Sequence, residues 1–580
     1  MKQLLLPLFF AAIALAQVGN PPQGSLKPVV VPKPTNLSQY VRDEAMLVAL
    51  GKALFWDVQV GSDGQTACAT CHFHAGADHR VQNQLAPPAT GGDAVRANRT
   101  LTIEDFPFRK LSNPLDRNSQ PLRNDRHVFG SAGVVRRDYA GFHPGKHAED
   151  AVETDGRTRQ VTNRNTPSVV NAVFYVRNFW DGRAKEDLEM TIHVATGEST
   201  EEEMVRLDNA SLASQALGPP LNDVEMSYKG RTWTDLARKL YALQPLGRQA
   251  VAEDDSVLGN GFVKGHTYVS LIRAAFAERL TADDALEPNF SFYFGLALQA
   301  YQSTLVSNDS PFDRFIEGNA SALTALQQQG LRAFQDARSE CLHCHQGPEF
   351  SAASFSSFRA SGSNPNRLDT LGFFRTGVSP IAEDAGIGNG LFKSPSLRNV
   401  ALTGPYFHDG GQATLSQVLE FYARRGDFPQ GGLGTGMNGI VLSAQDRTAI
   451  LAFFEALTDE RVRFERAPFD HPALCIPIGH DEDTTGAAAA PDRWALIPAV
   501  GRYGNGEPLQ TFEELLQGIG ADGSRAHNLT QPCTPSEFPS KSIDTISGPT
   551  AHTSGHDICT NNSEFLFCYW LRWRRRRIWR

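Results

Sequence analysis

Two copies of one cysteine–histidine motif constrain this chain more than any other feature. Residues 68–72 and 341–345 both read C-x-x-C-H, which is the attachment signature of c-type haem. A thioredoxin-like pair would need a βαβ context, and half of a zinc site would not explain a histidine in the same place twice. We therefore expect two covalent c-type haems. The expected attachment residues are Cys68, Cys71, Cys341 and Cys344, and the expected iron ligands are His72 and His345.

The sequence before each motif also repeats. Residues 51–55 read GKALF and residues 330–334 read GLRAF, and both lie in stretches with helical periodicity. Leucines at 47, 50 and 54 share one face of the first stretch, and those at 323, 326 and 331 do so less regularly in the second. Ser443 can cap a closing helix whose apolar stripe comprises Ile450, Leu451, Phe454 and Leu457. The pattern predicts two cytochrome c-like units.

The expected fold is mainly α, with two cytochrome c-like domains, each around a covalent haem, and with long loops and insertions. The 50 glycines and 34 prolines among 580 residues favour long loops between short helices. We expect a first haem domain with insertions over 17–305 and a second over 306–465. Gly, Pro, Ser and Thr are frequent over residues 481–554, so we expect a loop-rich or disordered tail over residues 466–580.

The N-terminus has the pattern of a secretion signal over residues 1–16. Lys2 precedes a short apolar run, and Ala14-Leu15-Ala16 is a small-x-small cleavage site. We therefore expect export, to the periplasm if the host is Gram-negative. Export permits disulfides among the remaining cysteines, whose connectivity the sequence does not give: Cys475, Cys533, Cys559 and Cys568.

The overall charge and the chain end bear on possible partners. A net charge of −9 gives no case for a nucleic-acid partner. Residues 565–580 mix aromatic side chains with arginines, which could bind a membrane surface. We favour a non-functional extension instead.

Two further segments carry a resemblance to a known family. Residues 165–183 contain N-T-P-S and F-W-D-G-R, and residues 394–410 contain S-P-S-L-R-N and T-G-P-Y-F-H-D-G. The two segments align at one constant offset that pairs Pro167 with Pro395 and Trp180 with His408. Together with the haem motifs they resemble the bacterial di-haem cytochrome c peroxidases and their MauG-like relatives. The resemblance covers about 51–459 and leaves out the last hundred or so residues.

This resemblance implies roles for individual residues. Hydrogen peroxide would react at the N-terminal haem, and a small cytochrome or copper protein would supply electrons through the C-terminal haem. Trp180 matches the family's tryptophan between the haems, Glu225 the distal acid–base group and Gln215 the distal glutamine. A calcium ion between the domains would be held by Asn165, Thr403 and Pro405.

The sequence departs from typical members of the family at both haems. Tyr422 stands where ordinary peroxidases have a methionine ligand to the C-terminal haem. It could ligate the iron as a phenolate, as in MauG-like proteins, or be a core tyrosine beside a five-coordinate haem. Arg157 replaces the usual distal histidine of the N-terminal haem, which would leave that haem open to peroxide.

Two insertions also distinguish the chain. The one between His72 and Asn165 contains four histidines, expected mostly at the surface although any could supply a ligand: His79, His127, His143 and His147. A Glu-rich insertion between Arg183 and Gln215 is expected to be a solvated surface excursion.

Three functions are compatible with these residues. The leading hypothesis is a cytochrome c peroxidase that reduces hydrogen peroxide to water. The alternatives are MauG-like oxidation of a protein or organic substrate, and a two-haem electron carrier without catalysis.

Overall fold

A computed structural model describes residues 23–87, 100–154, 158–197, 199–360, 371–429, 432–434, 436–480, 492–518 and 532–534. The expected signal peptide, Arg157, Cys559, Cys568 and the arginine-rich end lie outside these residues. Within the described part, no helix is both long and apolar enough to cross a bilayer.

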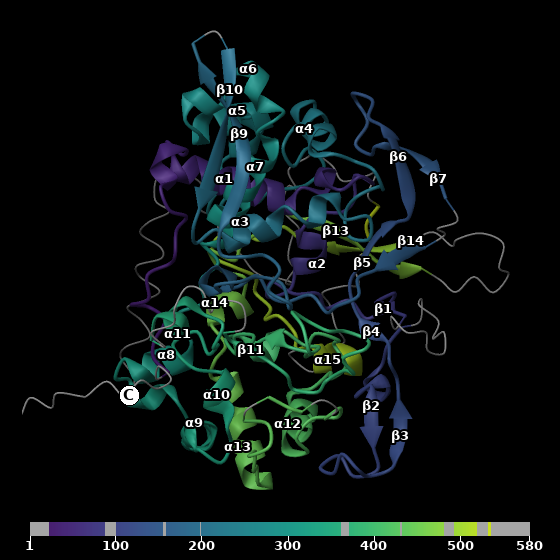
Figure 1. Cartoon of the computed structure of the whole chain (residues 1–580), viewed down its shortest axis with the longest axis vertical. Coiled ribbons are helices and arrows are strands. Elements are labelled where there is room, and N and C mark those ends of the chain that lie inside the picture. The colour runs from purple at the N-terminus through teal and green to yellow at the C-terminus, as the bar shows by residue number, and fades with distance from the viewer. Residues whose placement is uncertain are drawn as a thin grey trace, which may run out of the picture. The chain divides into compact units, whose positions relative to one another are not determined.

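The first group of helices precedes residue 303 and includes α2, which carries most of the first C-x-x-C-H motif and packs against α1 (Figure 1). Helix α1 crosses α7, and Gly51 lies at the crossing, where an added Cβ would overlap the carbonyl group of Ala297. The leucines at 47, 50 and 54 are all buried in the core that these helices share, as the periodicity predicted. The helices are α1 (Glu44–Trp56), α2 (Ala69–His72), α3 (Ser211–Ala216), α4 (Trp233–Tyr241), α5 (Tyr268–Ala275), α6 (Asp283–Leu286) and α7 (Phe290–Gln302).

The second group of helices repeats this arrangement around the second motif. Helix α9 crosses α13 at Gly330, where an added Cβ would overlap the carbonyl group of Ala449. Ser443 caps α13 as predicted, and its hydroxyl accepts from the Asp446 N–H at 3.1 Å. Leu326 is 44% exposed, so its assignment to the apolar face was wrong. The helices are α8 (Pro311–Ile316), α9 (Ala325–Gln335), α10 (Cys341–Cys344), α11 (Phe355–Ala360), α12 (Leu415–Ala423), α13 (Ala444–Glu455) and α14 (Glu460–Arg463).

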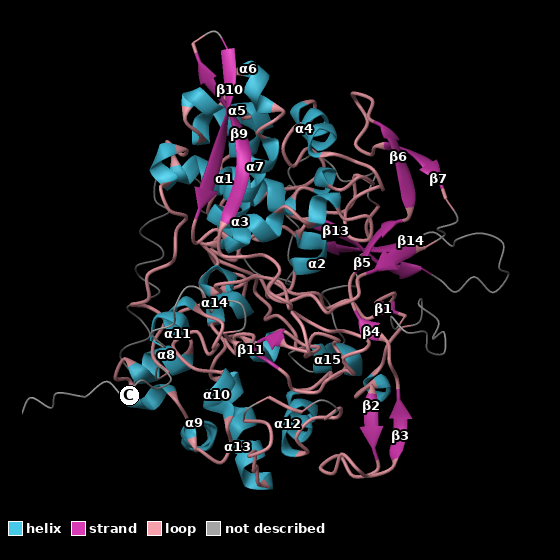
Figure 2. Cartoon of the chain, viewed as in Figure 1, coloured by secondary structure: helices cyan, strands magenta, loops and turns pink. Residues whose placement is uncertain are grey.

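Strands are more frequent than a mainly α fold implies (Figure 2). The described residues contain seven two-stranded antiparallel ladders, most of them in segments inserted between or after the helices. The pairs are β1 (Leu85–Ala86) with β4 (Val128–Phe129), β2 (Arg109–Leu111) with β3 (Pro121–Asn124), β5 (Ala132–Val135) with β8 (Arg159–Val161), β6 (Arg137–Gly141) with β7 (Asp150–Glu153), β9 (Leu188–Thr196) with β10 (Ser199–Leu207), β11 (Phe373–Phe374) with β12 (Phe392–Lys393), and β13 (Leu474–His480) with β14 (Asp492–Ile497).

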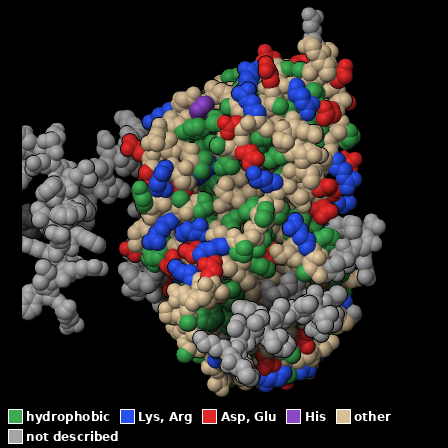
Figure 3. Space-filling view, turned by 90° about the vertical axis from the view of Figure 1, so that its left-hand side faces the viewer, with side chains coloured by type: hydrophobic (Ala, Val, Ile, Leu, Met, Phe, Trp, Pro, Cys, Tyr) green, Lys and Arg blue, Asp and Glu red, His purple; other side chains and the backbone are tan. Residues whose placement is uncertain are grey.

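The Glu-rich insertion is the longest of these ladders. β9 and β10 pair over their whole length, from Leu188 opposite Leu207 to Thr196 opposite Ser199. Ile192 and Val205 are buried on one face. Glu189 and Glu202 lie on the opposite face, whereas Glu201 and Glu203 lie on the same face as Ile192 and are themselves exposed or half-buried. The alternation fits an antiparallel pair with one solvated face. Figure 3 shows a face of the molecule on which acidic and basic side chains are interspersed.

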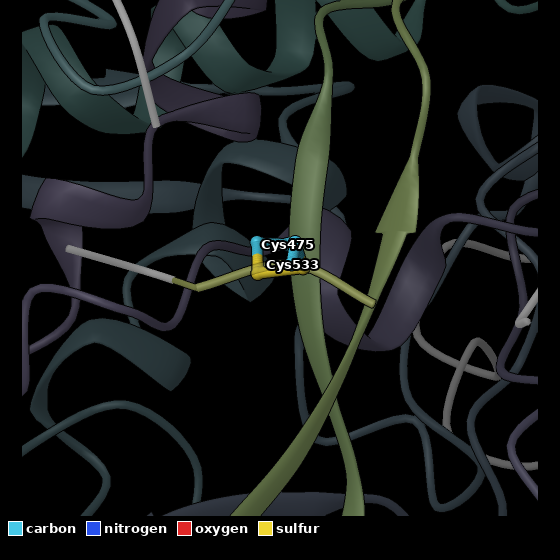
Figure 4. The surroundings of a disulfide bond; sticks show 2 residues. All are labelled: Cys475 and Cys533. Carbon is cyan, nitrogen blue, oxygen red and sulfur yellow. A yellow bond between two sulfur atoms is a disulfide. The ribbon is translucent and has the colours of Figure 1, made fainter. Parts of the chain in front are cut away.

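The segment after residue 466 differs from the expected loop-rich or disordered tail. β13, β14 and α15 (Phe512–Gln517) are formed, and Leu474 and Ile476 are buried in the same core as α1. A disulfide joins Cys475 of β13 to Cys533, 58 residues later in the sequence (Figure 4). Polar bonds add to this attachment, because Arg159 of β8 donates to Asp492 at 2.8 Å. This C-terminal segment is therefore part of the N-terminal half's core.

Candidate haem sites

The first motif lies on the short helix α2, beside α1. Cys68 and Cys71 are free thiols, as attachment to a porphyrin requires. The His72 Nδ1 lies 2.8 Å from the carbonyl oxygen of Gly76. A hydrogen bond donated by Nδ1 leaves Nε2 as a neutral ligand for iron. Burial lowers the pKa of His72, which also favours the neutral imidazole.

The second motif has the same local geometry on α10. Cys341 and Cys344 are free, and the His345 Nδ1 lies 3.1 Å from the carbonyl oxygen of Phe350. Burial lowers the pKa of His345 to about 4. A cavity of about 190 Å³, lined mainly by apolar side chains, lies next to both cysteines and this histidine. The two thiols, the oriented imidazole and the apolar lining fit a c-type haem.

The cavity next to the first motif contains the predicted acid–base groups. It measures about 140 Å³ and is lined by Cys71, His72, Gln215 and Glu225. Gln215 comes from α3, and Glu225 follows a turn in which Asn222 accepts from its backbone N–H at 3.1 Å. Burial raises the pKa of Glu225, and the charge of Arg183 opposes this shift. The structure thus brings together residues that are far apart in the sequence.

Trp180 lies between the two cavities. It lines both of them, and its indole N–H donates to the backbone carbonyl of Asn165 at 2.8 Å. Lys393, which the sequence analysis missed, also lines both cavities. Its ammonium group lies 3.7 Å from the centroid of the Tyr175 ring, and burial lowers its pKa to about 7. The only signal in the sequence was its position next to the S-P-S segment.

The three residues predicted to hold calcium all line the C-terminal cavity. The side-chain amide of Asn165 donates to the carbonyl of Pro405 at 2.6 Å and to that of Phe407 at 3.2 Å. Thr403 lies on the same stretch of chain and lines the same cavity. No group of three or more His, Cys, Asp or Glu side chains suited to a metal occurs in the part of the chain described here. The polar groups that the structure brings together at this point are the Asn165 amide and the two backbone carbonyls.

Tyr422 lines the same cavity as His345. Helix α12 positions it, and the Thr414–Gln417 capping box at the start of that helix is present as predicted. Burial raises the pKa of Tyr422. Met437 also lines this cavity and is buried, so it is a second candidate iron ligand that the sequence analysis missed. It lies in a Gly-rich loop after α12, where no periodicity marks it.

Three of the four histidines of the first insertion differ from the expected surface positions. His79 and His127 are buried, and His127 bonds to Asp125. His147 is partly buried against Gln59, whereas His143 is exposed, as expected. None of the four lines the described cavity beside His72.

Two thiol pairs, each with an oriented histidine and its own cavity, define a di-haem oxidoreductase of the c type. Residues 45–126 and 140–321 match the family described as di-haem cytochrome c peroxidase. Over 413 residues the chain is 32% identical to the methylamine utilization protein MauG of Methylorubrum extorquens, covering 71% of this chain and 78% of that protein. This chain belongs to the di-haem cytochrome c peroxidase family, and it is a peroxidase-type oxidoreductase with two c-type haems.

A second relative agrees with this assignment. The cytochrome c551 peroxidase of Pseudomonas aeruginosa is 29% identical over 319 residues, which cover 55% of this chain and 71% of that protein. Among solved structures, a MauG-like protein associated with microbial copper homeostasis matches with a TM-score of 0.44 and 20% identity, covering 76% of this chain and 97% of that one.

Proposed function

We propose that this protein reduces hydrogen peroxide to water at the N-terminal haem, with electrons entering through the C-terminal haem. The observation that carries the proposal is the position of Glu225 and Gln215 in the cavity of His72, together with Trp180, which lines both cavities. In this proposal residues 17–305 and 306–465 form two cytochrome c-like domains, one around each haem.

The reduction consumes two electrons and two protons for each peroxide. When bound, the N-terminal haem supplies the iron at which the O–O bond breaks, and the C-terminal haem supplies electrons. Glu225 takes a proton from one peroxide oxygen and returns it to the other, since a single carboxyl group can serve as base and then as acid. The amide of Gln215 orients the peroxide by hydrogen bonding. The bond from Trp180 to Asn165 fixes the indole ring in place between the two cavities.

The electron donor in this proposal is a small cytochrome or copper protein. Asn165, Thr403 and Pro405 would hold a calcium ion next to Trp180, because the Asn165 amide already meets two backbone carbonyls there. Rotation of that amide would place its oxygen beside the carbonyls, and oxygen ligands suit calcium. We also propose export, which the Cys475–Cys533 disulfide supports, since disulfides persist in oxidising compartments.

Replacement of Glu225 tests the function directly. We expect Glu225→Gln to lower kcat/KM for peroxide by about 100- to 10,000-fold, the usual contribution of a positioned acid–base group. Glu201→Gln, at an exposed position of β10, is the matched control and should leave the rate unchanged. Equal rates for both variants and the unaltered protein would contradict the role of Glu225.

A second candidate function is MauG-like oxidation of a protein or organic substrate, which Tyr422 favours by its position in the C-terminal cavity. Rapid oxidation of a reduced donor by peroxide supports the peroxidase, whereas a stable oxidised state that ignores the donor supports the alternative. A spectrum without high-spin haem, combined with no peroxide reaction after reduction, would instead support an electron carrier.

A further inference from the structure

Several aromatic side chains form a continuous series that begins at His72 and does not include Trp180. The Phe55 ring lies 6.3 Å from His72 and 5.3 Å from Tyr301, centroid to centroid. The Trp56 indole N–H donates to the Tyr301 hydroxyl at 2.9 Å. All four residues line one small cavity of about 40 Å³. Trp56 and Tyr301 are oxidisable side chains, and both are buried.

The series continues from Trp56 into the C-terminal segment. His471 stacks on the Trp56 ring with a centroid distance of 4.5 Å and an interplanar angle of 9°. The Nε2 atom of the same imidazole lies 3.1 Å from the Oε1 atom of Glu465. Glu465 lies next to Phe464, whose carbonyl accepts from the N–H of Asn505 in an exposed loop. The contacts therefore reach from the haem ligand to the surface.

Charged side chains lie near Trp56 on α1 and on the C-terminal segment. One turn before it on α1, the buried Lys52 contacts Asp255 at 2.8 Å and Asp470 at 3.4 Å. The pKa of His471 is raised and that of Glu465 lowered, in each case by attraction to the partner against the cost of burial. The three carboxyl groups act against the two basic groups and favour a positive charge on the ring, because buried charges are poorly screened.

Tyr301 and Phe55 are less suited to hold the oxidised state. A phenylalanine ring is hard to oxidise. Tyr301 would have to release its phenolic proton, and burial raises its pKa. Within the described residues its hydroxyl meets the Trp56 donor and no acceptor for that proton. Trp56 can lose an electron and still keep its N–H bond to Tyr301.

We propose that Trp56 is a second redox-active residue of the N-terminal haem domain, which supplies an electron when peroxide arrives and no donor is available. This inference rests on the proposed peroxide reduction. One electron comes through Trp180 from the C-terminal haem and the other from Trp56, while solvent supplies both protons by way of Glu225. The O–O bond breaks, two waters form, and Trp56 becomes an indole radical cation. A small-molecule thiol at the surface later returns one electron and releases its proton.

The role of such a residue is protection. An oxidising equivalent that no donor removes attacks the haem and its surroundings. Transfer of that equivalent to Trp56 and onward toward the surface prevents oxidation of the haem and its surroundings. The C-terminal segment then takes part in this electron transfer, because His471 stacks on Trp56 and Glu465 bonds to His471.

The test uses the full-length protein with both haems, exposed to peroxide without donor and frozen within milliseconds. We expect an indole radical in the EPR spectrum that is lost in Trp56→Phe and kept in Trp233→Phe. Trp233 is the matched control, because it packs against Phe290 and Phe294 in the same domain and has no place in the series. Peptide mass spectrometry should find oxygen added to Trp56, and the haem of Trp56→Phe should bleach several-fold faster.

Other outcomes would overturn the proposal. A radical that persists in Trp56→Phe and disappears in Tyr301→Phe would assign it to the tyrosine instead. If Trp56→Phe fails to retain haem, the mass spectrum of the unaltered protein decides, and unmodified Trp56 contradicts the proposal. Peroxide turnover with excess donor is measured on the same samples. Its absence would refute the proposed function, whereas normal turnover without oxidation of Trp56 would refute this inference alone.

Discussion

At the residue scale, the chemistry of the N-terminal cavity depends on the protonation of Glu225. Burial raises the pKa of this carboxyl group, and Arg183 is the charge that opposes the shift. The deprotonated form accepts the first proton of peroxide, so kcat/KM should fall as the pH drops through the raised pKa. We expect the midpoint of this acid limb to lie above the usual pKa range of a glutamate side chain.

The pH profile of kcat/KM for peroxide checks this prediction in two variants. Glu225→Gln should remove the limb. Arg183→Gln should move it to higher pH, because the carboxylate loses its stabilising charge. A limb that stays in place in both variants would belong to another group.

The C-terminal cavity has two side chains that could ligate its iron, Tyr422 and Met437. We expect Tyr422→Phe to change the absorption and EPR spectra of this haem and to raise its reduction potential, because a phenolate ligand stabilises the ferric state. Met437→Leu is the matched variant and should leave both properties unchanged. The reverse result would identify the methionine as the ligand.

At the scale of elements, a helix crossing next to each haem motif depends on a glycine. Gly51 of α1 lies against the backbone carbonyl group of Ala297 in α7, and Gly330 of α9 lies in the same way against that of Ala449 in α13. At both crossings the backbones of the two helices are therefore in close contact. We expect Gly51→Ala or Gly330→Ala to lower the free energy of unfolding by about 1–3 kcal/mol, the usual cost of overpacking. Denaturant unfolding of the haem-loaded protein measures this change.

Gly265→Ala is the control for these two variants, since an added Cβ there meets no atom within 4 Å. It should leave the unfolding curve in place. Loss of stability in all three variants would point to a general effect of the substitution instead of the crossing.

Local signals in the sequence predicted the helices better than the strands. The caps at Thr414 and Ser443 and the leucine stripe of α1 depend on residues within two or three turns of one another. The ladder of β5 with β8 joins residues that a whole hairpin separates, so no short pattern marks it. The burial of His79 likewise follows from contacts such as that with Phe512, far along the chain.

The candidate site was predictable to a similar extent. The haem motifs, Trp180, Gln215 and Glu225 lie in segments that resemble the family. Apart from Cys68, the predicted haem-binding residues and these three side chains line the two cavities. Lys393 and Met437 line these cavities without a pattern of their own. The stacking of His471 on Trp56 joins residues more than four hundred positions apart, and only the folded chain reveals it.

At the scale of the whole molecule, the C-terminal segment completes the core around the first haem motif. Ile476 and Leu474 are buried with α1, and Arg80, two residues after Asp78, donates to the carbonyl of Pro477 at 3.1 Å. Loss of this segment would expose apolar surface of the N-terminal domain. Attachment of the C-terminal segment therefore stabilises both the segment and the N-terminal domain.

The disulfide makes a measurable contribution to the free energy of unfolding. A bond between residues 58 positions apart stabilises the folded chain by about 4 kcal/mol in the chain-entropy treatment, because it restricts the unfolded state. We expect the double variant Cys475→Ser with Cys533→Ser to lower the free energy of unfolding by about 2–4 kcal/mol. The loss should appear in the unfolding of the N-terminal haem domain, followed by the spectrum of its haem, since β13 packs in that core. A loss confined to a separate transition, with the haem spectrum intact, would show that the segment folds independently of the domain it contacts.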